Sequence, residues 1–220
     1  MTTLAEYLTT GSAELGFPLT RDQLADFSLV ARELRKWNEK INLTALVDER
    51  DIAVKHFLDS LTVLPMLTGV DELLDIGSGG GFPGIPLKIV EPTMRIVSVD
   101  SIQKKINFQR HLARTLKFSG FTALPARVED LAGQYPHRFS HIVSRAFASL
   151  GQFAKVALPL LAPQGKIIAM KGSEGREEAQ SSAGQLAGLG LGVVAIEEFR
   201  LPVTGELRTL ILMTRLTEEK

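Results

Sequence analysis

The sequence predicts an α/β fold, a doubly wound and mostly parallel sheet that follows a helical N-terminal extension. Three observations lead to this prediction. From residue 71 onwards, apolar segments of strand length alternate with segments of helical periodicity. The first of these strands runs into a turn rich in glycine, which is typical of doubly wound sheets. A short connection that contains Pro202, Val203, Thr204 and Gly205 separates the last two strands, which indicates a hairpin and therefore one antiparallel strand.

The N-terminal part is expected to be helical up to residue 66. Apolar side chains recur at helical spacing, and Thr20 stands near a plausible helix start. A second helix is expected over residues 48–64, with Pro65 marking its end. The apolar face of the first helix is formed by Leu24, Phe27, Val30, Ala31, Leu34 and Trp37.

The remaining elements follow in alternation. Residues 1–66 are predicted to form the helical extension and residues 67–220 the α/β domain, together one compact unit. A polar, glycine-containing loop is expected over residues 171–178. Strands are predicted at 72–76, 95–100, 121–126, 140–145, 165–171, 193–201 and 207–215, and helices at 84–91, 103–117, 149–161 and 174–189.

Composition excludes several classes of protein. The 220 residues include no cysteine, which excludes disulfides, thiolate metal sites and a cysteine nucleophile. No window approaches the roughly 18 apolar residues of a membrane span, and the first residues do not resemble a secretory signal. We therefore expect a cytoplasmic protein without membrane contact. Of the four histidines, His137 and His141 are four residues apart, but they flank a loop bounded by Pro136 that enters a strand and do not share a helix face, so no metal is expected.

The glycine turn, residues 71–84 (DELLDIGSGGGFPG), is the most informative segment. Asp75 lies in the strand, and Gly77 and Gly79 follow it, so that the backbone can approach a nucleotide-like cofactor without Cβ atoms in the way. A second acid, Asp100, closes the next strand. A carboxylate at that point suits hydrogen bonding to ribose hydroxyls.

Two cofactors fit this pattern. The glycines also match a dinucleotide turn, but Pro83 and Pro86 lie at the helix start and offer no N–H to a diphosphate. Asp75 suits a cation at the turn better than a diphosphate. S-adenosylmethionine carries a sulfonium and an ammonium and no phosphate, so it is the predicted cofactor. A purely structural glycine turn remains the alternative.

Ligands of an open α/β sheet bind beyond the carboxyl ends of its strands. Glu129 follows the third strand, where it is expected to reach the adenine edge; a helix-dipole role is the alternative. The remaining residues at these ends are Gly77 to Phe82, Asp100 and Ser101, Val128, Ser144 and Arg145, and Lys171 and Gly172.

Arg145 is the predicted catalytic residue. Enzymes that methylate exocyclic amines generally carry acceptor groups after the fourth strand, whereas residues 144–147 here read Ser-Arg-Ala-Phe. Arginine only donates hydrogen bonds, so Arg145 should face a guanine O6, a phosphate or the cofactor carboxylate. Without a cysteine, carbon-5 pyrimidine methylation is excluded, which leaves a target with a free lone pair such as guanine N7. A structural ion pair is the alternative role for Arg145.

Two further features are open to more than one interpretation. Residues 101–128 carry six basic side chains and no acid, which indicates either a solvated helix face or a surface for an anionic polymer. His56 and Asp59 stand at helical i, i+3 spacing, and we expect them to hydrogen-bond each other rather than to act in catalysis.

Several motifs together resemble the bacterial small-subunit ribosomal RNA guanine-N7 methyltransferases, the glucose-inhibited division protein B family. The similarity covers most of the chain. Its most specific part is the glycine turn ending in Phe-Pro-Gly-Ile-Pro, combined with Ser-Arg-Ala at residues 144–146. The other shared segments are 36–38 (KWN), 42–44 (NLT), 56–60 (HFLDS) and 171–172 (KG).

The resemblance implies a Rossmann-like class I S-adenosylmethionine methyltransferase sheet of seven strands, the last one antiparallel. It also implies N7 methylation of a guanine in 16S ribosomal RNA. Whether the partner is free RNA or a small-subunit precursor stays open from the sequence, and a monomer is expected because nothing in the sequence demands a dimer. Two alternatives remain from the residues alone: methylation of a small molecule or protein, and a non-enzymatic RNA-binding scaffold. Cofactor contacts implied by the resemblance fall at Gly77, Phe82, Val128, Glu129 and Arg145.

Overall fold

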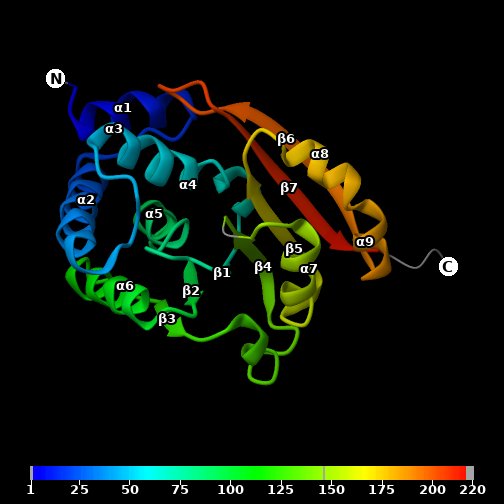
Figure 1. Cartoon of the computed structure of the whole chain (residues 1–220). Helices are drawn as coiled ribbons and strands as arrows, with labels where there is room; N and C mark the ends of the chain where they lie inside the picture. Colours follow the sequence, from blue (N-terminus) through cyan, green and yellow to red (C-terminus); the bar gives the residue numbers. More distant parts are fainter. Residues whose placement is uncertain (1, 146, 217–220) are drawn as a thin grey trace.

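A computed structural model describes residues 2–145 and 147–216, and Figure 1 shows its arrangement. Ala146, part of the predicted Ser-Arg-Ala element, lies outside the described residues. The predicted seven-stranded sheet is confirmed, in the order β3-β2-β1-β4-β5-β7-β6. Its strands are β1 (Glu72–Ile76), β2 (Arg95–Asp100), β3 (Phe121–Pro125), β4 (Phe139–Ser144), β5 (Leu161–Lys171), β6 (Leu191–Arg200) and β7 (Leu207–Arg215).

Helices cover both faces of the sheet. The α-helices are α1 (Leu4–Glu14), α2 (Arg21–Ile41), α3 (Glu49–Asp51), α4 (Asp59–Leu61), α5 (Gly84–Val90), α6 (Gln103–Thr115), α7 (Leu150–Ala157), α8 (Gly175–Ser181) and α9 (Ala183–Gly188). A π-helix, η1 (Ile52–Leu58), joins α3 to α4. Two 3₁₀ segments complete the described elements, η2 (Leu64–Leu67) and η3 (Val128–Leu131).

The strand directions agree with the predicted hairpin. β1 to β5 pair in parallel through β3-β2-β1-β4-β5, and β7 runs antiparallel to both β5 and β6. Neighbouring side chains of β1 enter different cores: Leu73 packs with residues of α1, α2, η1 and α4 to α6, whereas Leu74 packs with residues of η3 and α7 to α9. This alternation gives three layers, visible in Figure 1 as α1 to α6 on one side and α7 to α9 on the other.

The N-terminal helices share the core of the sheet. Phe27 and Phe57 are fully buried, with ring centroids 4.9 Å apart, and Phe57 also packs against Phe82 of the glycine turn. Thr20 caps α2, and its hydroxyl accepts the N–H of Gln23. The division at residue 66 stays a prediction. In the described part of the chain, no helix is long and apolar enough to cross a membrane.

Several predicted boundaries were wrong. Pro65 lies inside η2 rather than directly after a helix, because proline needs no N–H partner at the start of a helical turn. The predicted helix 149–161 ends at Ala157, and β5 starts at Leu161. Residues 175–178 of the predicted loop belong to α8, and the single predicted helix 174–189 is divided into α8 and α9 at Ser182.

Candidate functional site

Two cavities open at the carboxyl ends of the parallel strands and meet at Gly77. The first, which we call the Asp100 cavity, has a volume of about 300 Å³ and lies beside the ends of β2 and β3. The second, the Arg145 cavity, has a volume of about 590 Å³ and lies between the glycine turn, α4 and the start of β7. Because both cavities share Gly77, one elongated ligand can span them.

The glycine turn adopts the conformation that its sequence predicts. Gly77, Gly79 and Gly81 have φ angles of 69°, 57° and 94°, which L side chains rarely adopt. The Asp100 carboxylate fixes the turn, since its Oδ2 accepts the N–H of Gly79 at 2.9 Å. A Cβ added at Gly79 would meet no atom within 4 Å, so it would project into open space beside the Arg145 cavity that this residue lines.

Gln109 of α6 is hydrogen-bonded to the glycine turn, a role that was not predicted from the sequence. Its fully buried amide donates to Ser78 Oγ and to the carbonyl oxygen of Gly79, both at 2.8 Å. The available signal was a polar residue on the otherwise apolar face of α6, beside Phe108 and Leu112.

Asp75 does not lie at the mouth of the turn, so the predicted contact with a cationic ligand is corrected. Its side chain is completely buried, and its Oδ2 accepts the N–H of Gly84 at 2.9 Å. Burial raises the pKa of Asp75 to about 7, against the lowering effect of the Gly84 hydrogen bond. Asp75 lines neither cavity. Its carboxyl group instead ties the end of β1 to the start of α5.

The Asp100 cavity gathers five of the predicted cofactor residues, Gly77 among them. Asp100 is nearly buried; its Oδ1 accepts the N–H of Ile102 at 2.8 Å, and each carboxylate oxygen retains a lone pair for a further donor. Val128 and Glu129 begin η3, with Val128 buried and Glu129 exposed. Ser101 is also exposed at the rim. Hydrogen-bond acceptors therefore predominate at this end of the site.

Phe82 and His56 form one wall of the Arg145 cavity. Their rings stack in parallel, with centroids 4.4 Å apart and an interplanar angle of 5°. The predicted hydrogen bond between His56 and Asp59 is absent; His56 Nε2 instead contacts Thr44 Oγ1 at 2.8 Å. The cause is the π-helix, in which Asp59 N–H bonds to Val54 five residues back, so that i, i+3 side chains diverge. Burial, and then the nearby Arg145 charge, lower the pKa of His56 to about 3.

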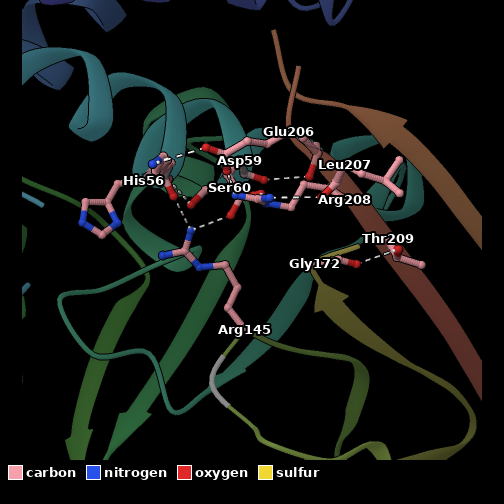
Figure 2. Close-up of polar contacts among 11 residues, drawn as sticks. His56, Asp59, Ser60, Arg145, Gly172, Glu206, Leu207, Arg208 and Thr209 are labelled. Atoms are coloured by element: carbon pink, nitrogen blue, oxygen red, sulfur yellow. Dashed lines mark hydrogen bonds and ion pairs between the residues drawn. The ribbon is translucent and has the colours of Figure 1, made fainter. Parts of the chain in front are cut away.

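Arg145 contacts a carboxylate that it shares with a second arginine (Figure 2). Its Nη1 lies 3.0 Å from Asp59 Oδ2 and 3.1 Å from the carbonyl oxygen of Lys55, and its guanidinium lies 5.4 Å from the Phe82 ring centroid. Arg208 Nε donates to the other Asp59 oxygen at 3.1 Å. The ion pair that was the alternative role for Arg145 is therefore present. It leaves Arg145 on the wall of the cavity, where it can still meet a ligand.

Basic side chains predominate in the lining of the Arg145 cavity. Of the described residues that line it, Lys55, Arg145, Lys171 and Arg208 are cationic, whereas Asp59 is the only carboxylate. Arg208 was missed in the sequence because it is 149 residues from Asp59 and enters the site only through the C-terminal hairpin. Within the described residues, no group of three or more metal-binding side chains comes together.

Solved structures with low sequence identity share the fold. An S-adenosylmethionine-dependent methyltransferase from Aquifex aeolicus superposes with a TM-score of 0.58 at 15% identity, over 78% of this chain and 96% of that chain. The TYW2 structure from M. jannaschii, in complex with S-adenosylmethionine, superposes with a TM-score of 0.54 at 11% identity, over 67% and 70% of the two chains.

Curated relatives are much closer in sequence. Ribosomal RNA small subunit methyltransferase G of Geobacter sulfurreducens is 55% identical over 91% of this chain and 93% of its own length. The protein of the same name from Deinococcus radiodurans is 40% identical over 96% of this chain and 84% of its own length. The family model described as GidB, rRNA small subunit methyltransferase G, matches residues 23–203, which include the glycine turn, the lining of the Asp100 cavity and that of the Arg145 cavity except Arg208. By sequence and by fold, this chain belongs to the rRNA small subunit methyltransferase G family.

Proposed function

We propose that this chain transfers a methyl group from S-adenosylmethionine to N7 of a guanine in 16S ribosomal RNA. The observation that carries the proposal is the meeting of two unlike cavities at Gly77. The acceptors of the Asp100 cavity suit the hydroxyl and amino groups of an adenosine. The cations of the Arg145 cavity suit the anionic backbone and the acceptor edge of a nucleotide.

The residues fit S-adenosylmethionine, which supplies an electrophilic methyl group on a sulfonium. Asp100 and Glu129 would hold its ribose and adenine, with Ser101 and Val128 beside them, while Gly77 and Gly79 leave room for its amino-acid part. Asp75 is not among the proposed cofactor ligands, because its buried carboxyl group lines neither cavity and accepts the N–H of Gly84 instead.

Methylation of guanine N7 depends on the alignment of the two reactants more than on a proton transfer. Guanine N7 offers a free lone pair, so methylation there needs no general base, and alignment can supply roughly 7–11 kcal/mol of barrier reduction. Arg145 would hold the guanine through its O6 or an adjacent phosphate, with Phe82 supporting the guanidinium from one side. The 16S RNA, free or in a precursor of the small subunit, is the proposed partner, and a monomer in the cytoplasm the proposed form.

Incubation with methyl-labelled S-adenosylmethionine tests this function. We expect label to enter 16S RNA that lacks the modification, and the modified strand to be cleaved by borohydride and aniline, as N7-methylguanine is. Free RNA and small-subunit particles should be compared in parallel. Label found in protein or small molecules, or in RNA that resists this cleavage, would contradict the proposal, and so would RNA binding without any transfer.

The rate of methyl transfer should show no bell-shaped dependence on pH between 6 and 9. With a pKa of about 3, His56 gains its proton only in strong acid and stays neutral throughout this range. Single-turnover rates against pH, for the wild type and His56→Ala, check this expectation. A sharp ionisation near neutral pH that vanishes in His56→Ala would make the histidine a general base.

A further inference from the structure

A run of basic side chains on α6 and the segment after it lines neither cavity of the site described above, apart from Arg127. No acid occurs between Ser101 and Val128, and none of the six cations in this stretch forms an ion pair with a described carboxylate. The cations of the Arg145 cavity, by contrast, are paired with carboxylates. The unpaired set consists of Lys104, Lys105, Arg110, Arg114, Lys117 and Arg127.

This basic run begins at the Asp100 cavity and ends at a third cavity. Arg127 lines the Asp100 cavity, and Ile102 at the start of α6 is bonded to Asp100. At 1.5 Å per residue, Arg114 lies about 18 Å from Ile102 along the helix. There a cavity of about 490 Å³ opens between the end of α6 and the edge strand β3.

We call this third cavity the α6 groove, and its lining combines cations with aromatic rings. Phe118 and Phe121 are half-buried and pack against each other, with ring centroids 5.8 Å apart at 50°. Arg110 is fixed in place, because its Nε donates to the carbonyl oxygen of Ala123 at 3.0 Å. Arg114 and Lys117 are exposed. The described residues that line the groove include no carboxylate.

We propose that the α6 groove binds an unpaired nucleotide of the ribosomal RNA substrate, at a distance from the methylated guanine. The inference rests on the proposed function, since it concerns the same RNA. Arg114 and Lys117 bind phosphates, and the base lies against the aromatic rings, a combination typical of single-stranded nucleic acid sites. The described lining of the groove has cations and aromatic rings but no carboxylate, and no broad apolar surface is exposed around it. This combination suits RNA better than an acidic protein or a membrane.

Such a site anchors the substrate without touching the reacting atoms. Binding that is equal in the ground state and the transition state lowers KM and leaves kcat unchanged. The α6 groove should therefore act on affinity for RNA alone, whereas Arg145 should act on the rate.

The double variant R114Q/K117Q tests the phosphate contacts. Neither side chain forms a described ion pair or hydrogen bond, so the fold should be preserved. At physiological salt, we expect RNA affinity to fall by about 5- to 10-fold and KM to rise equally. The slope of log K against log salt should become shallower by about 1.4, the value for two single-strand phosphate contacts. The cofactor Kd and kcat should stay unchanged.

The matched control is K155Q/K166Q, which removes the same charge from exposed sites on α7 and β5. It should bind RNA like the wild type; equal losses in both double variants would mean that only net charge matters and would overturn the groove. Phe118→Leu keeps an apolar side chain but removes the ring, and it should weaken RNA binding roughly fivefold or more. Unchanged binding in Phe118→Leu, with a thermal melt like the wild type, would overturn the nucleotide assignment.

A cross-link locates the contact independently. RNA carrying 4-thiouridine should cross-link on irradiation to the peptide that contains residues 110–123, and R114Q/K117Q should reduce the yield. Cross-links confined to other peptides would overturn the proposal. Absence of methylation in the wild type would instead contradict the proposed function, and because binding and cross-linking need no transfer, the two failures are distinguishable.

Discussion

Arg145→Ala should lower kcat by at least about 100-fold, a loss of roughly 2.7 kcal/mol of transition-state stabilisation. The side chain lines the larger cavity beside Gly77 and offers only donors, at the point where nucleotide and cofactor must meet. Single-turnover methylation of 16S RNA measures the rate, and calorimetric titration measures the cofactor Kd.

Because Asp59 contacts two arginines, the effect of Arg145→Ala on catalysis can be distinguished from an effect on folding. In Arg145→Ala, Asp59 keeps its contact with Arg208, so no buried charge is left without a partner and the protein should stay folded. His56→Ala, on the same cavity wall, should lose much less activity, because its ring has no proton to transfer. A rate for Arg145→Ala as high as that of His56→Ala would mean that Arg145 only holds α4 against β4.

Local sequence patterns were sufficient to predict most strands of the sheet. β1, β2 and β7 have the predicted bounds because each is an apolar run that ends at a charge or a turn. The glycine turn was also predictable, since its positive φ angles require glycine at Gly77, Gly79 and Gly81.

Contacts between distant segments were not predictable in the same way. Asp75 and Asp100 both lie at or near the end of a buried strand in the sequence. In the structure, however, Asp75 is buried and accepts the N–H of Gly84, whereas Asp100 lines a cavity. Arg208 enters the site through pairing of β7 with β5. The π-helix, which the helical spacing of the apolar residues does not predict, separates His56 from Asp59. The individual cofactor and catalytic roles of the site residues stay predictions.

Gly79→Val is expected to abolish binding of S-adenosylmethionine, with Kd raised at least about 100-fold. The new side chain would extend from the turn into the open space where the amino-acid part of the cofactor is proposed to lie. Calorimetric titration gives the affinity, and a thermal melt shows whether the variant is folded.

The effect of backbone strain in Gly79→Val has to be distinguished from the steric effect of its side chain on the cofactor. A branched residue at φ 57° is strained in any surroundings, so loss of binding alone would not identify the cause. Gly69 provides the control, because its φ is 75°, a Cβ there also meets no atom within 4 Å, and it lines none of the cavities described above. Gly69→Val should lose a similar stability, of about 1–2 kcal/mol, and bind the cofactor normally. If a folded Gly79→Val binds as well as Gly69→Val, the cofactor does not lie over the glycine turn.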